Sequence, residues 1–528
     1  MSPSEPAKRA TVVPVVRRVG SWVLVIGSLM AVPSGTAGAA PLDHHGDALM
    51  RVRATPAEVE ALGLDVWTHG TAEPSVVARA TLQQRALLDV SGLDYVVLDP
   101  DLGPRVAAER ARLLAAPPVQ GGLDPGFHDD YHSFEVVLAR LAAMVANRPD
   151  RVSHVELGLS LEGRLIRGIR ITNPGADDRP VVVVQSCQHA REWISVASTM
   201  FAAEQFVTAA EGTELDVLLD QVELVVLPVA NPDGYVYSWE VDRFWRKNRR
   251  EGVGVDTNRN WSVAWGGEGA SPDPSAENYR GAGPFSEPEP LAMRDFVEGD
   301  PRVIAFLDVH SFGQFVLFPW GYDVAASDDH ELFAGLAADV ADVMMAQHDV
   351  PYVPLQSAEL YPASGNTVDW AYGTHGIYAI ALELRPGPEA EIGFVLSPSD
   401  IVPTGEEVVH AIAELIETAV ELGPGEPGGG DTGTTGDGTT GAEGGSMGPA
   451  STGGVGESTG ALTSATGPSD DAPPAGTAFT SGSGSDDDAA PQDLDVSDGC
   501  ACRHEPVPRR GWWALGLLGL GLGLRRRR

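Results

Sequence analysis

The sequence predicts an α/β fold for the main body of this 528-residue chain. Two observations carry the prediction: from Tyr131 to Leu422 short apolar runs alternate with amphipathic segments, and the runs are continuous and rich in β-branched residues. Continuous apolar runs are typical of strands that are covered on both faces, and longer periodic segments are typical of helices. Strands that alternate with helices in this way form a sheet between helical layers.

The individual elements of the main body follow from this alternation. The predicted strands are residues 181–185, 222–230, 303–310 and 378–384. The predicted helices include residues 133–147 and 331–348, where apolar side chains recur with helical spacing. Together these elements assign residues 124–422 to one α/β domain.

A separate, small α+β unit is predicted over residues 48–115. Thr55 is placed as the N-cap of a helix, and Glu58 three residues later completes a capping box. The other elements predicted in this unit are a strand at 50–54, a β-rich run at 93–99 and a helix at 104–116. A linker rich in proline and glycine follows the last helix and separates this unit from the main body.

Both ends of the chain are predicted to be targeting segments. Residues 1–39 contain basic residues, then an apolar run, then small residues, in the order of a secretory signal peptide. Residues 500–528 contain a Gly-Cys motif, a short apolar stretch and an arginine cluster, and they resemble the C-terminal sorting tails of myxobacterial surface proteins. We therefore expect export to the cell surface or secretion, with sorting and processing machinery as partners. Membrane contact is expected only through the tail, which a plain tail anchor would also explain.

Composition excludes several other classes of protein. The formal net charge is −38, which disfavours contact with phosphate backbones, so no nucleic-acid partner is expected. Residues 423–499 contain few large apolar side chains, which predicts a disordered spacer rich in Gly, Ser, Thr and Asp. With three cysteines there is no disulfide framework, and Cys187, which continues an apolar strand, is predicted to be a buried core thiol.

Side chains capable of chemistry stand at the ends of three predicted strands. His189 follows the first strand, His310 ends the third, and Glu383 lies near the end of the fourth. Ligands of open α/β sheets gather outside the carboxyl ends of the strands, so these residues are predicted to share one site. Glu192, three residues after His189, adds a second carboxylate to it.

The residue types of this predicted site suit a metal. Two imidazoles and one carboxylate, here His189, His310 and Glu192, are a donor set of catalytic zinc sites that leave one position open to water. Zinc lowers the pKa of its bound water to about 7 and so makes hydroxide available at neutral pH. Cobalt or manganese would fit the same donors, so zinc is inferred from ligand type.

The stretches around these residues form an ordered set of motifs. In chain order they are HAREW, NPDGY, FWRKNR, DTNRNW, YRGAGPFSEPE, DVHS, YPASGNTVDW and LELRP. This set resembles the zinc metallocarboxypeptidases of the carboxypeptidase A and T type, and the resemblance covers roughly residues 127–422. It implies a mixed, mostly parallel central sheet with helices on both faces, one Zn²⁺ per catalytic domain, and hydrolysis of the C-terminal peptide bond of peptides and proteins.

The resemblance also implies a role for each matching residue. Glu383 becomes the general base that takes a proton from the zinc-bound water and later delivers it to the leaving amine. Arg246 becomes the electrophile that, with zinc, stabilises the tetrahedral oxyanion. Asn258 and Arg259 hold the free carboxylate of the substrate, for which the two-pronged guanidinium of arginine is well suited.

Three further residues are implied to contact the substrate. Tyr361 closes over the site, and Arg191 lines the substrate path. Val368 matches the position that selects the substrate side chain, where enzymes specific for basic residues place an acid. An apolar or aromatic C-terminal residue is therefore expected to be preferred, with the polar Asn366 and Gln356 widening the preference. Asp369 is predicted to be structural.

The N-terminal unit, residues 48–115, resembles the inhibitory propeptide of these enzymes, a small α+β open sandwich. The hypothesis is that it shields the zinc cleft until the connecting helix is cut, with Arg110 and Arg112 as candidate cut sites. The alternative is a permanently attached folding aid.

Two other functions compete with this interpretation. One is a zinc peptidase that trims peptidoglycan stem peptides, but such enzymes generally alter the carboxylate clamp, which Asn258 and Arg259 supply here. The other is an inactive surface-binding protein on a peptidase scaffold, but no metal ligand and no general base is missing from the sequence. A monomer is the expected state.

Overall fold

The computed structural model describes residues 40–69, 75–117, 122–175, 178–388, 390 and 392–425. The predicted signal peptide, nearly all of the predicted spacer and the predicted sorting tail lie outside the described residues. Within the described ranges, no helix is long and apolar enough to cross a bilayer.

The N-terminal unit is a four-stranded antiparallel sheet with its own apolar core. Its strands are β1 (Ala48–Val52), β2 (Asp65–His69), β3 (Val76–Ala80) and β4 (Tyr95–Asp99), in the order β2-β3-β1-β4. Its helices are α1 (Pro56–Glu60), α2 (Leu82–Ser91) and α3 (Gly103–Ala115). Val59 of α1 and Leu88 of α2 pack on the sheet within one apolar cluster. The capping box predicted at Thr55 and Glu58 is present, whereas β1 starts two residues before the predicted strand.

The main body is built on an eight-stranded mixed sheet, as expected for an α/β fold. The strands follow the order β11-β10-β12-β9-β7-β8-β6-β5. Their bounds are β5 (Val152–Leu159), β6 (Leu165–Ile171), β7 (Val181–Ser186), β8 (Glu223–Leu227), β9 (Val303–Ser311), β10 (Phe315–Phe318), β11 (Val353–Gln356) and β12 (Tyr378–Leu384). The four central strands β12, β9, β7 and β8 run parallel and are the four strands that the sequence predicts. Antiparallel pairs occur outside this centre, where β10 meets β12 and where β6 meets β8 and β5.

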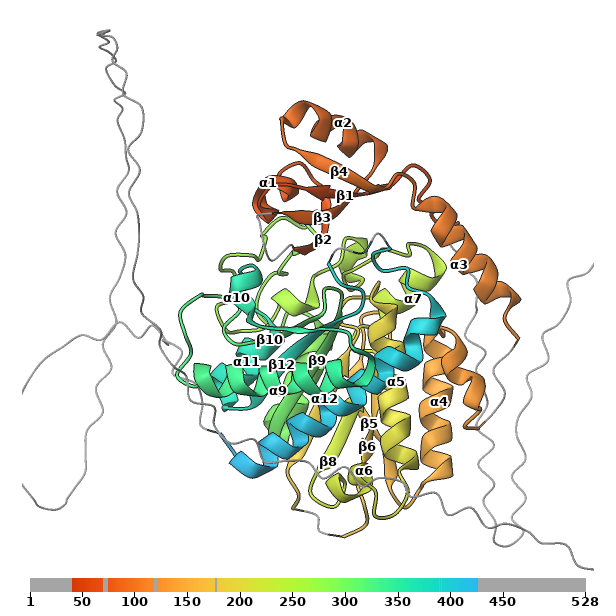
Figure 1. Cartoon of the computed structure of the whole chain (residues 1–528), viewed down its shortest axis with the longest axis vertical. Helices are drawn as coiled ribbons and strands as arrows, with labels where there is room; N and C mark the ends of the chain where they lie inside the picture. The colour runs from red at the N-terminus through yellow and green to blue at the C-terminus, as the bar shows by residue number, and fades with distance from the viewer. Residues whose placement is uncertain are drawn as a thin grey trace, which may run out of the picture. The chain divides into compact units, whose positions relative to one another are not determined.

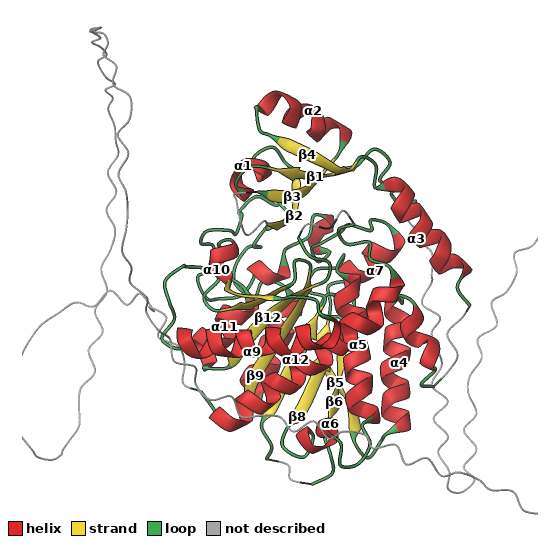
Figure 2. Cartoon of the chain, viewed as in Figure 1, coloured by secondary structure: helices red, strands yellow, loops and turns green. Residues whose placement is uncertain are grey.

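Helices cover both faces of this sheet (Figures 1 and 2). They are α4 (Phe134–Asn147), α5 (Trp193–Thr208), α6 (Glu214–Leu218), α7 (Pro232–Glu240), α8 (Pro288–Gly299), α9 (His330–His348), α10 (Ser357–Leu360), α11 (Thr367–His375) and α12 (Ile401–Leu422). The two helices predicted at 133–147 and 331–348 correspond to α4 and α9, each within one residue at its start.

Alternate residues of the central strands enter two different cores. Val182 and Val184 of β7 pack with α4, α5, α9 and α12, whereas Val181 and Val183 pack with α8 and α11. Successive side chains of a strand point to opposite faces, so a strand covered by helices on both sides must be apolar at every position. This explains why the run of valines in β7 has no polar alternation.

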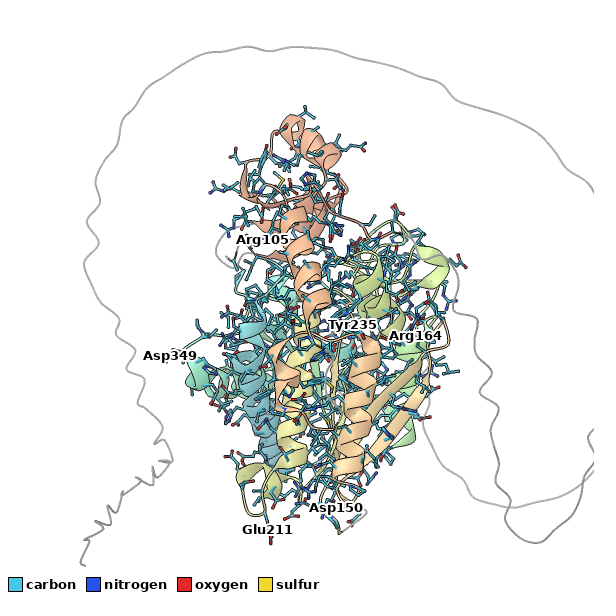
Figure 3. The ribbon with its side chains drawn as sticks, turned by 90° about the vertical axis from the view of Figure 1, so that its right-hand side faces the viewer. Arg105, Asp150, Arg164, Glu211, Tyr235 and Asp349 are labelled. Carbon is cyan, nitrogen blue, oxygen red and sulfur yellow. The ribbon has the colours of Figure 1, made fainter. Side chains whose placement is uncertain are left out.

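The N-terminal unit contacts the main body through its sheet and through α3, which Figure 3 shows from the side with Arg105 labelled. An aromatic cluster forms between the two parts, in which the ring centroid of Trp67 lies 4.9 Å from that of Phe244 and 4.8 Å from that of Phe394. On α3, Glu109 accepts a hydrogen bond of 2.6 Å from Nε of Arg243 in the main body. Both residues are almost fully buried, so the contact is a closed one.

A buried ion pair fixes the start of the main body to helix α5. Arg140 of α4 donates to both carboxylate oxygens of Glu204 at 2.7 Å and also to the backbone oxygens of Gly122 and Asp124. The Arg140 side chain is 1% exposed, so removing it leaves a carboxylate that has lost its cation.

We expect Arg140→Met to lower the free energy of unfolding by about 3–5 kcal/mol, because breaking a buried pair leaves an uncompensated charge. Urea denaturation followed by circular dichroism measures the difference. Arg294→Met is the matched control, since Arg294 pairs with Asp295 at the surface, where such pairs contribute roughly 0–1 kcal/mol. Equal losses in the two variants would contradict the assignment.

Candidate metal centre and active site

Three buried side chains converge at the carboxyl ends of β7 and β9. His189 follows β7, Glu192 is the N-cap residue of α5, and His310 is the penultimate residue of β9. Their donor atoms all lie within 4.8 Å of one another. Nδ1 of His189 lies 2.8 Å from Oε1 of Glu192, and Nδ1 of His310 lies 3.1 Å from Oε2 of the same carboxylate. The residues that the sequence analysis grouped as metal ligands are thus together in space.

The backbone brings His189 to this position by a sharp turn. Cys187, directly after β7, has a positive φ of 59°, a conformation that non-glycine residues seldom adopt. The turn takes the chain out of the sheet, so that His189 and Glu192 lie on the short segment between β7 and α5. Cys187 itself is fully buried, as predicted, and burial raises the pKa of its thiol well above the ordinary value.

The donor set fits a divalent cation such as Zn²⁺. Burial disfavours the Glu192 carboxylate, but the two imidazoles lower the pKa of Glu192 below its usual range, so it is ionised. Nδ1 of His189 and Nδ1 of His310 lie only 3.1 Å apart, facing each other. Two imidazoles and a carboxylate, all directed at one point, are the donors that zinc prefers.

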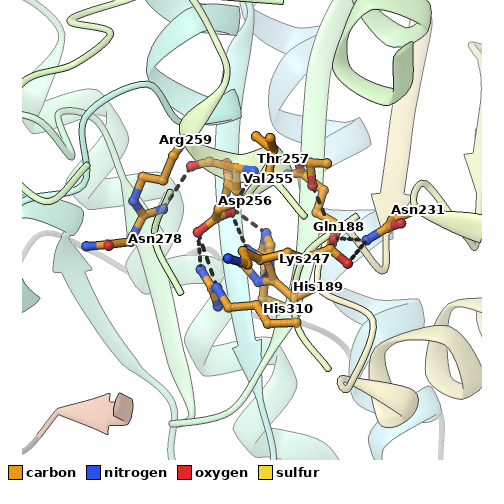
Figure 4. A network of polar contacts seen from close by, with 12 residues as sticks. Gln188, His189, Asn231, Lys247, Val255, Asp256, Thr257, Arg259, Asn278 and His310 are labelled. Atoms are coloured by element: carbon orange, nitrogen blue, oxygen red, sulfur yellow. Dashed lines mark hydrogen bonds and ion pairs between the residues drawn. The ribbon is translucent and has the colours of Figure 1, made fainter. Parts of the chain in front are cut away.

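Each imidazole is also held from behind by a carboxylate. Nε2 of His189 lies 3.2 Å from Oδ1 of Asp256, and Nε2 of His310 lies 3.0 Å from Oδ2 of Asp308. Such partners fix the tautomer and the ring orientation of a metal-binding histidine. The sequence analysis assigned neither aspartate a role, although both lie inside its quoted motifs DTNRNW and DVHS. Figure 4 shows Asp256 beside the two histidines.

Glu383 lies beside this group on β12. Its register partner on β9 is His310, so the parallel pairing of the two strands sets the two side chains next to each other. Oε2 of Glu383 is buried and has no hydrogen-bond partner among the described residues. Burial, followed by the charge of Glu192, raises the pKa of Glu383 to about 8. A buried carboxyl with a free oxygen and a raised pKa is suited to exchange a proton.

Arg246 and Asn258 contact residues of this group, and Arg259 follows Asn258 directly in the chain (Figure 4 labels Arg259). Arg246 donates to Oδ2 of Asp256 at 2.8 Å, so one aspartate orients both a candidate metal ligand and this arginine. Asn258 and Arg259 lie in a short 3-10 turn, Thr257–Arg259. Nε of Arg259 donates to the backbone oxygen of Gly269 at 2.9 Å, which holds the guanidinium in place.

Tyr361 contacts Arg259, and Val368 belongs to an apolar cluster of the main body. The guanidinium of Arg259 lies 5.9 Å from the centroid of the Tyr361 ring. Val368, in the first turn of α11, packs in an apolar cluster with Leu317 and Ala381. The amides of the polar residues Gln356 and Asn366 donate to backbone oxygens and, for Asn366, also to a carboxylate.

Asp369 has the structural role predicted for it. Its carboxylate accepts hydrogen bonds from the backbone N–H groups of Gly321 and Tyr322 and from the amide of Asn366. It therefore ties the loop after β10 to the start of α11. Its side chain is fully buried and directed away from the metal group.

Arg191 differs from the expectation of an open substrate path. Its guanidinium donates to both oxygens of Asp65 in the N-terminal unit, at 2.8 and 2.9 Å. It also lies 4.5 Å from the centroid of the Phe394 ring, and the residue is 1% exposed. In the intact chain Arg191 is therefore covered by the N-terminal unit, a contact that sequence reasoning could not find.

Comparison with known proteins identifies the family to which this arrangement belongs. The zinc carboxypeptidase family model matches residues 137–411. Carboxypeptidase A2 of Rattus norvegicus is 34% identical over 372 residues, which are 68% of this chain and 88% of that protein. Carboxypeptidase B of Astacus astacus is 35% identical and covers 53% of this chain and 94% of its own length.

Solved structures agree with this assignment. The crystal structure of thrombin-activatable fibrinolysis inhibitor has a TM-score of 0.65 and 27% identity, covering 72% of this chain and 99% of that one. Carboxypeptidase A from Helicoverpa armigera gives a TM-score of 0.65 and 28% identity, covering 72% and 98%. The chain belongs to the zinc carboxypeptidase family and is a zinc-dependent exopeptidase that removes C-terminal residues.

We expect Glu192→Gln to lose the metal, because the neutral amide removes the only anionic donor of the group while keeping its size. After dialysis, elemental analysis should give about one zinc per native chain and well under half of that per variant chain, since each ligand contributes much of the affinity. Glu289→Gln, which alters another buried carboxyl outside the site, is the control. Full zinc content in Glu192→Gln would contradict the ligand assignment.

Proposed function

We propose that His189, Glu192 and His310 hold the catalytic zinc and that Glu383 is the general base of peptide hydrolysis. Bound zinc supplies Lewis acidity, which polarises the scissile carbonyl and makes water more acidic. Glu383 accepts a proton from the attacking water and returns it to the amine that leaves. The observation that carries this proposal is the convergence of His189, Glu192 and His310 on one buried point, beside Glu383, whose Oε2 has no hydrogen-bond partner among the described residues.

Removal of C-terminal residues requires a group that binds a free carboxylate, and we propose Arg259 and Asn258 for this role. Arg259 is almost fully buried at the edge of the cleft, and its guanidinium is held by the backbone oxygens of Gly269 and Asn258. A fixed guanidinium pays little entropy when it binds a carboxylate in two-pronged fashion. Arg246, held by Asp256, is proposed to stabilise the negative charge that develops on the carbonyl oxygen. Tyr361, next to Arg259, closes over the bound residue.

We expect Glu383→Gln to lower kcat by about 10²–10⁴-fold, the usual contribution of a general base. The thermal midpoint should not fall, because the amide replaces a carboxyl whose charged form burial disfavours. Steady-state hydrolysis of a blocked dipeptide and differential scanning calorimetry measure the two effects. A variant that retains native kcat would contradict the role.

Arg259→Lys is expected to raise KM about 10–100-fold, because the ammonium keeps the charge but loses the second hydrogen bond to the carboxylate. Blocked dipeptides with a free C-terminus provide the assay. Arg294→Lys, at a half-buried position of α8 away from these residues, should leave KM unchanged. An unchanged KM in Arg259→Lys would move the carboxylate site elsewhere.

The substrate preference is proposed to be an apolar or aromatic C-terminal residue. Val368, Leu317 and Ala381 form an apolar surface beside the cleft, and all three are more than nine-tenths buried. No charged side chain belongs to this cluster, so a basic residue would lose hydration without gaining a partner.

We expect Val368→Asp to change the preferred C-terminal residue of the substrate from apolar to basic. A carboxylate at this position should favour Arg and Lys and disfavour Phe and Leu, shifting the ratio of their kcat/KM values by at least about tenfold, the effect of one charged hydrogen bond. Competition between blocked dipeptides ending in Phe and Arg measures that ratio. Native chain that already prefers Arg would contradict the proposed pocket.

The N-terminal unit, residues 48–115, is proposed to be an inhibitory propeptide. Asp65 covers Arg191, and Glu109 covers Arg243, so two buried cations of the main body are neutralised by this unit. Glu60, at the end of α1, lies near the cleft: burial raises its pKa, and the charges of Arg259 and Arg246 act against that rise. The match to the solved structure of thrombin-activatable fibrinolysis inhibitor covers a larger share of the chain than residues 124–422, which agrees with a two-part precursor.

Release of this unit is proposed to follow a cut near the end of α3. Of the two candidate sites, Arg112 contacts Asp130 of the main body, whereas no such contact with the main body holds Arg110 among the described interactions. Residues 118–121, which follow the helix, lie outside the described residues. The signal peptide, the spacer and the sorting tail, also outside them, are proposed to direct export and surface attachment.

We expect the double variant Asp65→Asn, Glu109→Gln to raise the peptidase activity of the intact chain toward that of the proteolysed body. The change removes the two anions that neutralise Arg191 and Arg243 at the contact. Asp99→Asn, which alters an ion pair inside the N-terminal unit, is the control. Equal activity of intact native chain and of a body lacking residues before 123 would show that the unit does not inhibit.

A further inference from the structure

Asp308 lies between the metal group and the interior of the sheet. It precedes His310 by two residues on β9, so both side chains point to the same face of the strand. Asp308 is fully buried, and its Oδ2 lies 3.0 Å from Nε2 of His310. A carboxylate accepts hydrogen bonds only, so it fixes the Nε2–H tautomer of His310 and leaves Nδ1 for the metal.

The same carboxylate oxygen accepts a second hydrogen bond, from Gln188. Nε2 of Gln188 lies 2.6 Å from Oδ2 of Asp308 and 2.7 Å from Oγ1 of Thr367, and Oε1 of Gln188 accepts from Nε1 of Trp261 at 3.3 Å. An indole N–H only donates and a carboxylate only accepts. The Gln188 amide therefore has one orientation that satisfies both neighbours, with its NH₂ group toward Asp308.

This orientation is passed on to the carboxylate-binding turn. Because Oγ1 of Thr367 accepts from Gln188, its own proton is directed at Oδ1 of Asn258, 3.1 Å away. The backbone N–H of Thr367 donates to the same oxygen at 3.0 Å. With Oδ1 occupied by two donors, the Asn258 amide directs its NH₂ group away from Thr367. Nδ2 lies 3.3 Å from Nε2 of His310, next to the metal ligands.

The five side chains thus form a ring of contacts, which runs from His310 through Asp308, Gln188, Thr367 and Asn258 back to His310. The last contact, from Nδ2 of Asn258 to Nε2 of His310, is not a hydrogen bond, because both nitrogens carry hydrogen. All five residues are buried or half-buried. In this ring the Asp308 carboxylate is the member that carries a fixed charge and can only accept. It therefore directs the Gln188 amide and, through it, the hydroxyl of Thr367, which together with the backbone N–H of Thr367 holds Oδ1 of Asn258.

We propose that Asp308 is a positioning residue with two effects: it orients His310 toward the metal, and through Gln188 and Thr367 it turns the Asn258 amide toward the substrate carboxylate. The second effect rests on the proposed function of Asn258. The ring couples the two halves of the site, so that metal ligand and carboxylate clamp are aligned by one buried charge.

Three variants of the full chain separate these effects from a merely structural one. Asp308→Asn removes the charge and allows the ring to reverse. Gln188→Leu breaks the ring but leaves the contact between Asp308 and His310 intact. Glu289→Gln is the matched control, because it also converts a buried carboxyl to an amide but contacts Asn248 outside the ring.

Zinc affinity is measured by competition with a chromophoric chelator, and the visible spectrum of the cobalt-loaded chain reports the ligand geometry. KM is measured with a blocked dipeptide after removal of the N-terminal unit. Asp308→Asn should lose about 10–100-fold in zinc affinity and change the cobalt spectrum, as expected for a partner of a metal-bound histidine. It should also raise KM about tenfold. Gln188→Leu should keep zinc affinity within about twofold and raise KM about tenfold, the effect of misdirecting one hydrogen bond to a charged group.

If Asp308→Asn and Glu289→Gln have the same zinc affinity and the same cobalt spectrum, the proposed orientation of His310 by Asp308 is overturned. A native KM in Gln188→Leu would overturn the second effect. If the native chain hydrolyses no C-terminal peptide bond, the proposed function fails, whereas the chelator competition and the cobalt spectrum still decide the effect on His310.

Discussion

The contact of the Glu192 carboxylate with the two imidazoles is the interaction on which the site depends. The three side chains are almost fully buried and lie within hydrogen-bond distance of one another. This arrangement requires β7 and β9 to be adjacent and parallel, and it requires the chain to turn sharply at Cys187. The cost of burying the charge is offset by the imidazoles, by the backbone N–H of Ser311 and, in the working enzyme, by zinc. The valine-rich cores on both faces of the sheet hold the strands rigidly enough to keep this geometry.

Buried charge is compensated throughout the cleft by partners from other elements. Asp256 serves both His189 and Arg246, and Asp308 serves both His310 and Gln188, so a few carboxylates orient most of the site. The N-terminal unit also supplies a partner for a buried charge, since Asp65 neutralises Arg191 with two hydrogen bonds. In the proposed activation, release of this unit removes Asp65 from Arg191 and so links release electrostatically to the candidate site.

Sequence reasoning succeeded where a pattern is local. The central strands have apolar runs that a sheet covered on both faces demands, and the capping box at Thr55 is read from two residues three positions apart. It did not find β10, β11 or the antiparallel edge formed by β5 and β6. The strands β10 and β11 have only four residues each, and polar or charged residues interrupt β5 and β6. It also assigned no role to Asp256 and Asp308, because residue type alone does not distinguish a buried carboxylate from one at the surface.

The sequence by itself determined the chemistry: His189, Glu192, His310 and Glu383 are fixed by residue type, by the ends of apolar runs and by ordered motifs. Tertiary structure alone decided which groups lie behind them. The contact of Gln188 with Asp308 and Thr367, and the burial of Arg191 under Asp65, join residues that are far apart in the chain, by as many as 179 positions. Such contacts depend on strand register and domain packing, which no local pattern encodes.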